Sequence, residues 1–141
     1  MELKGSDCVF CAGDGGTRLW ADPLLRIVAV EDEHYAGFCR VIVNRHVKEM
    51  TELNKDERRR VMDAVFAVEA GLRELMRPDK INLASLGNQV AHVHWHVVPR
   101  YRDDAHFPAP IWAAPARVAT KRADPDWSAL QARLRLLKTE I

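Results

Sequence analysis

The chain has 141 residues, of which 48% are apolar and 29% are charged, and its formal net charge is +1. This length suits one domain with a single hydrophobic core, and the composition is that of a soluble globular protein. The near-neutral charge gives no electrostatic reason to expect a nucleic acid or a membrane surface as a partner. The N-terminal residues contain no apolar run long enough for a signal peptide or a membrane span, so we expect a cytoplasmic protein.

The first predicted elements are a loop and two short strands. Residues 8–17 contain three glycines and the pair Cys8-x-x-Cys11, which predicts a loop. Residues 24–30 (LLRIVAV) and 38–43 (FCRVIV) are rich in β-branched side chains and are bounded by polar turns, so they predict neighbouring strands. Cys39 lies inside the second apolar run, where a buried thiol is the simplest interpretation.

The longest predicted element is a helix that begins after Asn54 and ends before Pro78. Asn54 with Glu57 three residues later is a capping-box pattern, which marks a helix N-terminus. Apolar residues follow at helical spacing and predict one buried face: Val61, Val65, Val68, Leu72 and Leu75.

The rest of the chain predicts two more strands, a loop and a C-terminal helix. Residues 81–86 and 92–98 favour strands, with Pro99 ending the second, and residues 103–122 are rich in proline and alanine and predict a surface loop. Asp124-Pro125 predicts the start of a helix whose apolar stripe is either core or a subunit contact. Strands around one long helix, without strict alternation, indicate an α+β fold with an antiparallel sheet.

Three histidines alternate with apolar residues in the last predicted strand. His92, His94 and His96 are separated by Val93, Trp95 and Val97, and alternate side chains of a strand share one face. Three imidazoles on one face can hold a catalytic zinc ion with an activated water. Alternatively, one imidazole can attack phosphorus directly as a covalent nucleophile. The spacing alone leaves both chemistries open.

The residues around these histidines resemble the signature of the histidine-triad (HIT) family. Residues 81–100 (INLASLGNQVAHVHWHVVPR) contain a glycine-polar-polar turn followed by three histidines that alternate with apolar residues. Upstream, VIVNRH ends at His46, and the cysteine pair precedes it in the expected order. The resemblance runs to about residue 112 of a single domain (residues 1–141), and residues 113–141 form a C-terminal extension with a helix. It implies a HIT-like antiparallel sheet with one long helix, joined across a homodimer.

The resemblance also implies roles for the residues of the site. His94, the middle histidine, is expected to attack the α-phosphorus of a nucleotide and to form a nucleotidyl-histidine that water hydrolyses. His96 is expected to donate to a phosphoryl oxygen or to the leaving group, and His92 completes the catalytic triad. Residues expected to bind substrate, by analogy with the family, are Gln89, Asn88, Asn82, Asp32 and Ile27.

The cysteine pair and two histidines together predict a structural zinc site. Cys8, Cys11, His46 and His92 form a Cys₂His₂ set, which suits tetrahedral zinc, and some relatives in the resembled family bind zinc in this way. The alternative is that both cysteines are reduced thiols beside hydrogen-bonded histidines. The proposed phosphorus chemistry itself requires no metal.

The predicted activity is hydrolysis or transfer at the α-phosphate of a dinucleoside polyphosphate such as diadenosine tetraphosphate. Cleavage of a nucleoside phosphoramidate is the nearest alternative, because both reactions pass through the same intermediate. A zinc-dependent hydrolase with three histidine ligands is a second alternative. The segment around His106 and Trp112 resembles one that follows the triad in a bacterial branch of the family, where it would close over the site; an open surface loop is the other interpretation.

Overall fold

The computed structural model describes residues 7–137 and shows an α+β fold built on one antiparallel sheet of five strands. The strands are β1 (Thr17–Ala21), β2 (Leu25–Ala29), β3 (Cys39–Val43), β4 (Lys80–Ala84) and β5 (His94–Arg100), and their order in the sheet is β1-β2-β3-β5-β4. The helices are α1 (Val9–Ala12), α2 (Lys55–Met76) and α3 (Trp127–Leu134), with a short 3₁₀ turn, η2 (Met50–Glu52), before α2. The predicted fold class is therefore confirmed.

Helix α2 begins at the predicted cap. The Asn54 side chain accepts a hydrogen bond from the Glu57 backbone N–H at 2.8 Å, and the Glu57 carboxylate accepts one from the Asn54 N–H at 2.9 Å. These bonds satisfy two of the backbone donors that a helix start leaves without partners. The helix ends at Met76, where Arg77 adopts a left-handed conformation ahead of Pro78.

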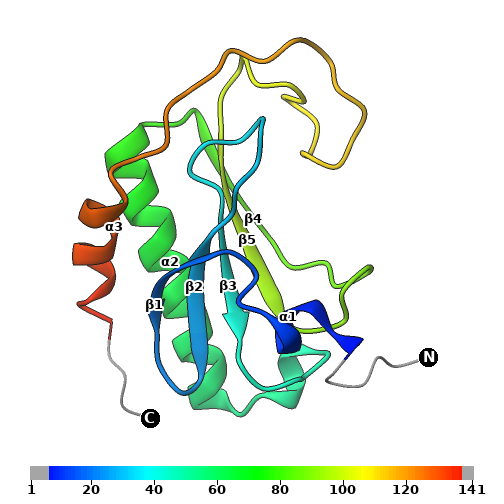
Figure 1. The fold of residues 1–141 in the computed structure, drawn as a ribbon, viewed down its shortest axis with the longest axis vertical. Helices are drawn as coiled ribbons and strands as arrows, with labels where there is room; N and C mark the ends of the chain where they lie inside the picture. Colours follow the sequence, from blue (N-terminus) through cyan, green and yellow to red (C-terminus); the bar gives the residue numbers. More distant parts are fainter. Residues whose placement is uncertain (1–6, 138–141) are drawn as a thin grey trace.

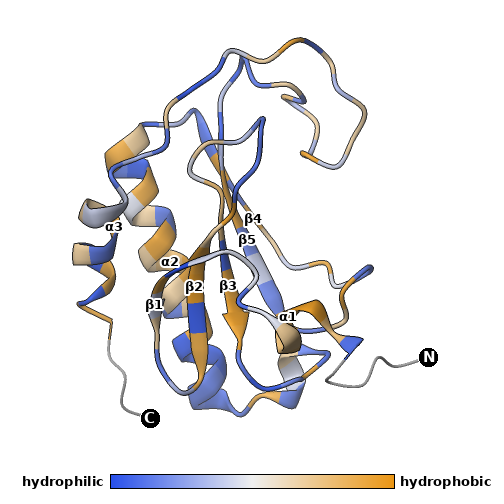
Figure 2. Ribbon diagram, in the orientation of Figure 1, coloured by the Kyte–Doolittle hydropathy of each residue, from blue (hydrophilic) through white to orange (hydrophobic). Residues whose placement is uncertain are grey.

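The two faces of the sheet are covered differently. Helix α2 packs on β3, β4 and β5, and α3 packs on α2 and β1, so both helices cover the same face (Figure 1). The main core lies between these helices and the sheet, and it contains the helix residues Val61, Val65, Val68, Leu72, Leu130 and Leu134. The stripe of α3 is thus part of the core of this chain. Figure 2 shows β3 as mostly hydrophobic and the start of β5 as hydrophilic, because β5 begins with a histidine.

Several boundaries differ from the sequence prediction. Strand β1 was not expected, since Leu19 is its only buried residue and no clear alternation marks it. Strand β5 begins at His94 and continues through Pro99, which was expected to end it. Proline is tolerated there because the pairing with β3 stops at Val97 and leaves that edge of β5 free. The N-cap of α3 is Asp126, not residue 124 as predicted.

In the part of the chain from residue 7 to residue 137, no helix is both long enough and apolar enough to cross a membrane.

Candidate functional site

Two histidines of β5 project from the sheet face that α2 and α3 leave open. His94 pairs with Ile42 across the sheet and His96 pairs with Arg40, and their ring centroids lie 4.8 Å apart. Both rings are buried, and Phe10 of α1 lies 4.7 Å from the His94 ring. Strand alternation therefore brings two imidazoles together, with an aromatic ring packed against His94.

A backbone hydrogen bond fixes the protonation of His94. Its Nδ1 lies 2.6 Å from the backbone oxygen of His92, and a carbonyl can only accept, so Nδ1 carries the hydrogen. The other nitrogen, Nε2, is then left with a free lone pair. Burial lowers the pKa of His94, the hydrogen bond to His92 partly opposes this, and the positive charge of Arg40 lowers the pKa further. The ring is therefore neutral near pH 7.

His96 lies beside His94 and is held neutral more strongly. Burial, then the charges of His94 and Arg40, lower the pKa of His96 to about 4. Its Nδ1 is buried and has no hydrogen-bond partner among the residues that the structure describes. A buried polar atom without a partner costs free energy, so this nitrogen is suited to a ligand that completes the site.

The first histidine of the triad turns toward the cysteine pair. His92 Nδ1 lies 3.3 Å from Cys8 Sγ, 3.4 Å from Cys11 Sγ and 3.2 Å from His46 Nδ1. Cys11 Sγ is 3.3 Å from His46 Nδ1, and all four ligand atoms lie within 4.8 Å of one another. Zinc bonds of about 2.0 to 2.3 Å in a tetrahedron hold their ligand atoms about 3.3 to 3.8 Å apart. Four of the six atom pairs therefore lie at or near the spacing of a tetrahedral zinc site, and the other two lie within 4.8 Å.

The surroundings of this cluster also suit a cation. His92 Nε2 lies 2.5 Å from the backbone oxygen of Val43, which fixes the hydrogen on Nε2 and leaves Nδ1 as the ligand atom. Burial and the neighbouring Cys8 raise the pKa of the Cys11 thiol, so two thiolates side by side need a compensating positive charge. Arg26 holds the loop that carries the cysteines by donating to the backbone oxygens of Phe10 and Gly13.

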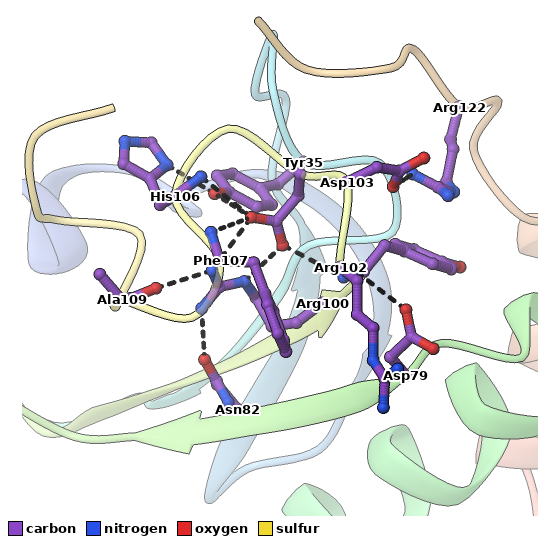
Figure 3. A network of polar contacts seen from close by, with 12 residues as sticks. Tyr35, Asp79, Asn82, Arg100, Arg102, Asp103, His106, Phe107, Ala109 and Arg122 are labelled. Carbon is purple, nitrogen blue, oxygen red and sulfur yellow. Dashed lines mark hydrogen bonds and ion pairs between the residues drawn. The ribbon is translucent and has the colours of Figure 1, made fainter. Parts of the chain in front are cut away.

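The segment after β5 is tied to the sheet by a buried polar network (Figure 3). Arg100 is only 2% exposed, and it donates to both carboxylate oxygens of Asp104, to the Asn82 side chain and to the Ala109 backbone oxygen. Burial would raise the pKa of Asp104, but the hydrogen bonds from Arg100 and from backbone N–H groups hold it well below its usual range. Residues 104–106 are buried, so the prediction of a plain surface loop is wrong for this part.

The same segment reaches the histidines. Tyr35 Oη lies 2.5 Å from His106 Nδ1, and the Tyr35 and His106 rings are stacked. Further along, the Trp112 ring lies edge-on to the ring of His96 with centroids 5.0 Å apart, although half of Trp112 is exposed. The segment therefore covers one side of the site. This agrees with the interpretation that it closes over the site and not with that of an open surface loop.

The expected substrate residues are not all at the site. Asn88 and Gln89 are exposed in the turn before the triad, and a pocket beside His94 is bordered by Gly87 of this turn. Asn82 lies on β4, two strand positions from Ala84, which pairs with His96, and its amide oxygen accepts from Arg100. Asp32 is exposed in the loop between β2 and β3.

The prediction that Ile27 binds substrate is wrong. This residue is fully buried in the core between the helices and the sheet, so it does not face the histidines. Its neighbour Val28 lies on the other face and packs with Phe10 and Ile42.

Arg40 is a site residue that the sequence prediction missed. It pairs with His96 across β3 and β5, on the face of the sheet that carries both site histidines. The signal was present in the sequence, because a single arginine interrupts the apolar run FCRVIV. A charged residue inside a buried strand is rare unless it has a partner or a function.

Comparisons with known proteins agree with this fold. A family model described as the HIT domain matches residues 16–103. A histidine triad protein from Marinobacter aquaeolei VT8 is 24% identical, with a TM-score of 0.72 over 89% of this chain and 93% of that chain. One from Bradyrhizobium japonicum is 24% identical, with a TM-score of 0.69 over 88% and 91%. A Zn-bound histidine triad family protein from Mycobacterium smegmatis is 24% identical, with a TM-score of 0.63 over 95% and 97%. The comparison with curated proteins found no match.

Proposed function

Because this chain belongs to the histidine-triad (HIT) family, we propose that it is a nucleotide hydrolase or transferase in which His94 is the covalent nucleophile. The observation that carries the proposal is the bond from His94 Nδ1 to the His92 backbone oxygen. It directs the lone pair of Nε2 away from the backbone, in the way that an orienting acceptor sets the tautomer of a catalytic histidine. The lowered pKa of His94 keeps that lone pair free at neutral pH.

The proposed reaction has two balanced steps. In the first, His94 Nε2 forms a bond to the α-phosphorus of the nucleotide, and the bond from that phosphorus to the leaving group breaks. In the second, water attacks the same phosphorus, the bond to nitrogen breaks, and a nucleoside monophosphate leaves. Transfer to another acceptor replaces water by that acceptor. Neutral His96 supplies a ring N–H that stabilises the phosphoryl oxygens or protonates the leaving group.

The proposed substrate is a dinucleoside polyphosphate such as diadenosine tetraphosphate. Asn88 and Gln89 are exposed in the turn that begins at Gly87, and Gly87 lines a pocket beside His94, whereas Trp112 packs on the ring of His96. We take the His94 side as the one that accepts a large leaving group. A nucleoside phosphoramidate would use the same nucleophile and the same intermediate. Relative kcat/KM values for the two substrate types decide between them.

The geometry does not favour a hydrolase with three histidines on one catalytic zinc. Both ring nitrogens of His92 are engaged, Nε2 with the Val43 oxygen and Nδ1 with the cysteine cluster. The group of possible metal ligands found among residues 7–137 contains Cys8, Cys11, His46 and His92, but not the two site histidines of β5.

We propose that this group binds one structural zinc ion. The ion would tie the α1 loop to the start of β5, while the chemistry at His94 needs no metal. We also expect a homodimer through β4, which is an edge strand, because at the other edge the Leu19 backbone oxygen of β1 accepts a hydrogen bond from the Gln131 side chain of α3. A monomeric mass by light scattering would contradict the dimer.

Mass spectrometry of enzyme quenched during turnover of diadenosine tetraphosphate tests the nucleophile. The expected product is a nucleoside monophosphate adduct on a peptide that contains His94. The variant His94→Gly should form no adduct and lose at least about a thousandfold in kcat, as removal of a covalent nucleophile does.

His34→Ala is the matched control, because His34 is exposed in the loop between β2 and β3. This variant should keep both the adduct and the rate. Retention of the hydrolysis rate in His94→Gly, or an adduct on any residue other than His94, would disprove the proposal.

A further inference from the structure

Arg40 is a cation that lies at the site, and not all of its hydrogen-bond donors are used by the protein. Its Nη1 donates to the backbone oxygen of Gly15 at 3.0 Å, whereas its Nε is buried without a hydrogen-bond partner. Among the residues that the structure describes, no carboxylate lies within ion-pair distance of Arg40. A guanidinium that only stabilised the fold would be expected to use its donors on protein acceptors.

Arg26 on the neighbouring strand shows what a structural arginine looks like in this sheet. It lies on the same face as Arg40, one strand away, and its guanidinium makes four hydrogen bonds. Three go to backbone oxygens of the α1 loop, and one goes to the Asn44 side chain. The difference between the two arginines is therefore one of partners, since both are in the same sheet and both are largely withdrawn from water.

Two aromatic rings hold Arg40 and the site histidines in one group. The Arg40 guanidinium carbon lies 5.5 Å from the ring centroid of Phe10 and 5.6 Å from that of Phe38. Phe10 also packs against His94, and Phe38 packs against His96 with centroids 5.7 Å apart. Both the pairing with His96 and the shared rings place the positive charge beside the histidines.

We propose that Arg40 donates hydrogen bonds to the non-bridging phosphoryl oxygens of the nucleotide as the phosphoryl group is transferred to His94. The inference rests on the proposed function and adds to it a charged phosphate-binding residue. Negative charge on these oxygens must be stabilised in the transition state, and fixed donors in a pocket withdrawn from water do this most effectively.

An arginine suits this role better than a lysine. The planar guanidinium offers two parallel N–H groups to an anionic phosphoryl group and is the less strongly hydrated cation. Burial lowers the pKa of Arg40 and the charge of Asp32 raises it, but arginine stays protonated at neutral pH. A phosphoryl oxygen bound at this position would supply the acceptor that the buried Nε lacks.

Competition binding of adenosine and AMP tests the contact without requiring turnover. We expect wild-type protein to bind AMP more tightly than adenosine. In Arg40→Met the AMP affinity should fall by about 10- to 100-fold, the size expected for losing charge-assisted hydrogen bonds, while the adenosine affinity stays unchanged. Arg40→Lys keeps the charge but loses the bidentate geometry, so its AMP affinity should fall between the two.

Arg18→Met is the matched control, because Arg18 is an exposed arginine on β1 whose ion pair is with Asp14. It should leave both affinities as in wild type. The proposal is overturned if wild type does not prefer AMP over adenosine, or if Arg40→Met and Arg40→Lys weaken both ligands equally, which indicates a purely structural role.

The covalent mechanism and the role of Arg40 can fail separately. An adduct on His94 together with unchanged AMP selectivity in both Arg40 variants would overturn only the role of Arg40. Loss of AMP selectivity in these variants without any adduct on His94 would support a phosphate contact and overturn the covalent mechanism.

Discussion

His92 connects the cysteine cluster to His94, the proposed nucleophile. Its Nδ1 faces the cysteines, its Nε2 donates to the Val43 oxygen, and its backbone oxygen accepts from His94. The atoms that orient the nucleophile are therefore only a few bonds from the atoms that fit a metal ion. Substitution of His92 would disturb both centres, which makes the cysteines the better positions for separating them.

Glu57 gives a residue-scale prediction about pH. Hydrogen bonds from Arg45 and then from the Asn54 backbone lower the pKa of Glu57 to about 2. A carboxylate with a lowered folded-state pKa adds stability that is complete above its unfolded pKa of about 4.3 and is lost as the pH falls toward 2. Glu57→Gln should therefore lower the free energy of unfolding by about 1 kcal/mol at pH 7.

Chemical denaturation at a series of pH values checks this. The difference between wild type and Glu57→Gln should shrink as the pH falls from about 4.5 to 2. Asp56→Asn is the control, because Asp56 is exposed and pairs with Arg59 on the surface of the same helix turn. A stability difference between wild type and Glu57→Gln that is independent of pH would contradict the role of the charge.

At single positions the sequence predicted which histidines lie together better than it predicted which face of a strand points to the site. Strand alternation was enough to place His94 and His96 together, because side chains on a strand alternate whatever the neighbours are. It did not decide which face of LLRIVAV points to the site, since nearly every residue in that run is apolar. Arg26 could have decided the orientation of this strand. It lies on the site face with Val28, so Ile27 lies on the other face.

At the scale of elements, one buried ion pair, between Arg100 and Asp104, holds the segment after β5 against the sheet. We call this segment, residues 101–112, the strap. Asp104 accepts from Arg100, from Tyr101 and from the two backbone N–H groups of His106 and Phe107. These bonds fix the turn that leads to Trp112. No pattern in the proline-rich and alanine-rich sequence revealed the strap, because its anchors are Tyr35 and Asn82, far away in the chain.

Loss of the Asp104 charge should release the strap. Asp104→Asn leaves the Arg100 charge buried without its counterion, so we expect a loss of about 3 kcal/mol in the free energy of unfolding. We also expect faster trypsin cleavage after Arg117, whose side chain donates to the Asp104 backbone oxygen. Denaturation and timed proteolysis of the full chain measure the two effects.

The neighbouring residue provides the control for this experiment. Asp103 makes a surface ion pair with Arg122, and its side chain is about half exposed. Asp103→Asn should change stability by less than about 1 kcal/mol, because exposed pairs contribute little. Equal effects of the two substitutions would show that the buried pair does not anchor the segment.

For the whole molecule, the sheet separates the main apolar core from the candidate site. The face under α2 and α3 carries most of the apolar core, and the opposite face carries the histidines, Arg40 and the cysteine cluster. The sequence predicted this division from the long helix and the histidine strand. It missed β1, and only the family resemblance, not the residue pattern, suggested the covering role of residues 104–112, because neither segment has a periodic pattern of its own.

Zinc is predicted to stabilise the whole molecule without taking part in the reaction. Elemental analysis of purified protein should give one zinc per chain, and Cys11→Ser should lower both the zinc content and the melting temperature. Cys39→Ala is the control, because Cys39 is buried in the helix-side core: it should lower the melting temperature but keep the zinc. Adduct formation on His94 should persist in zinc-depleted protein that remains folded. Zinc-free wild type, or equal zinc in Cys11→Ser, would contradict the site.

Trp112 also gives the site an optical signal. Of the four tryptophans, Trp20, Trp95 and Trp127 pack against the helix-side core, whereas the ring of Trp112 packs on the ring of His96 with half of its surface exposed. An indole in contact with both solvent and the ring of His96 is sensitive to what occupies the space next to it. The intrinsic fluorescence of the unlabelled chain therefore includes an emitter in contact with the site, so ligand entry can be followed in real time without an added dye.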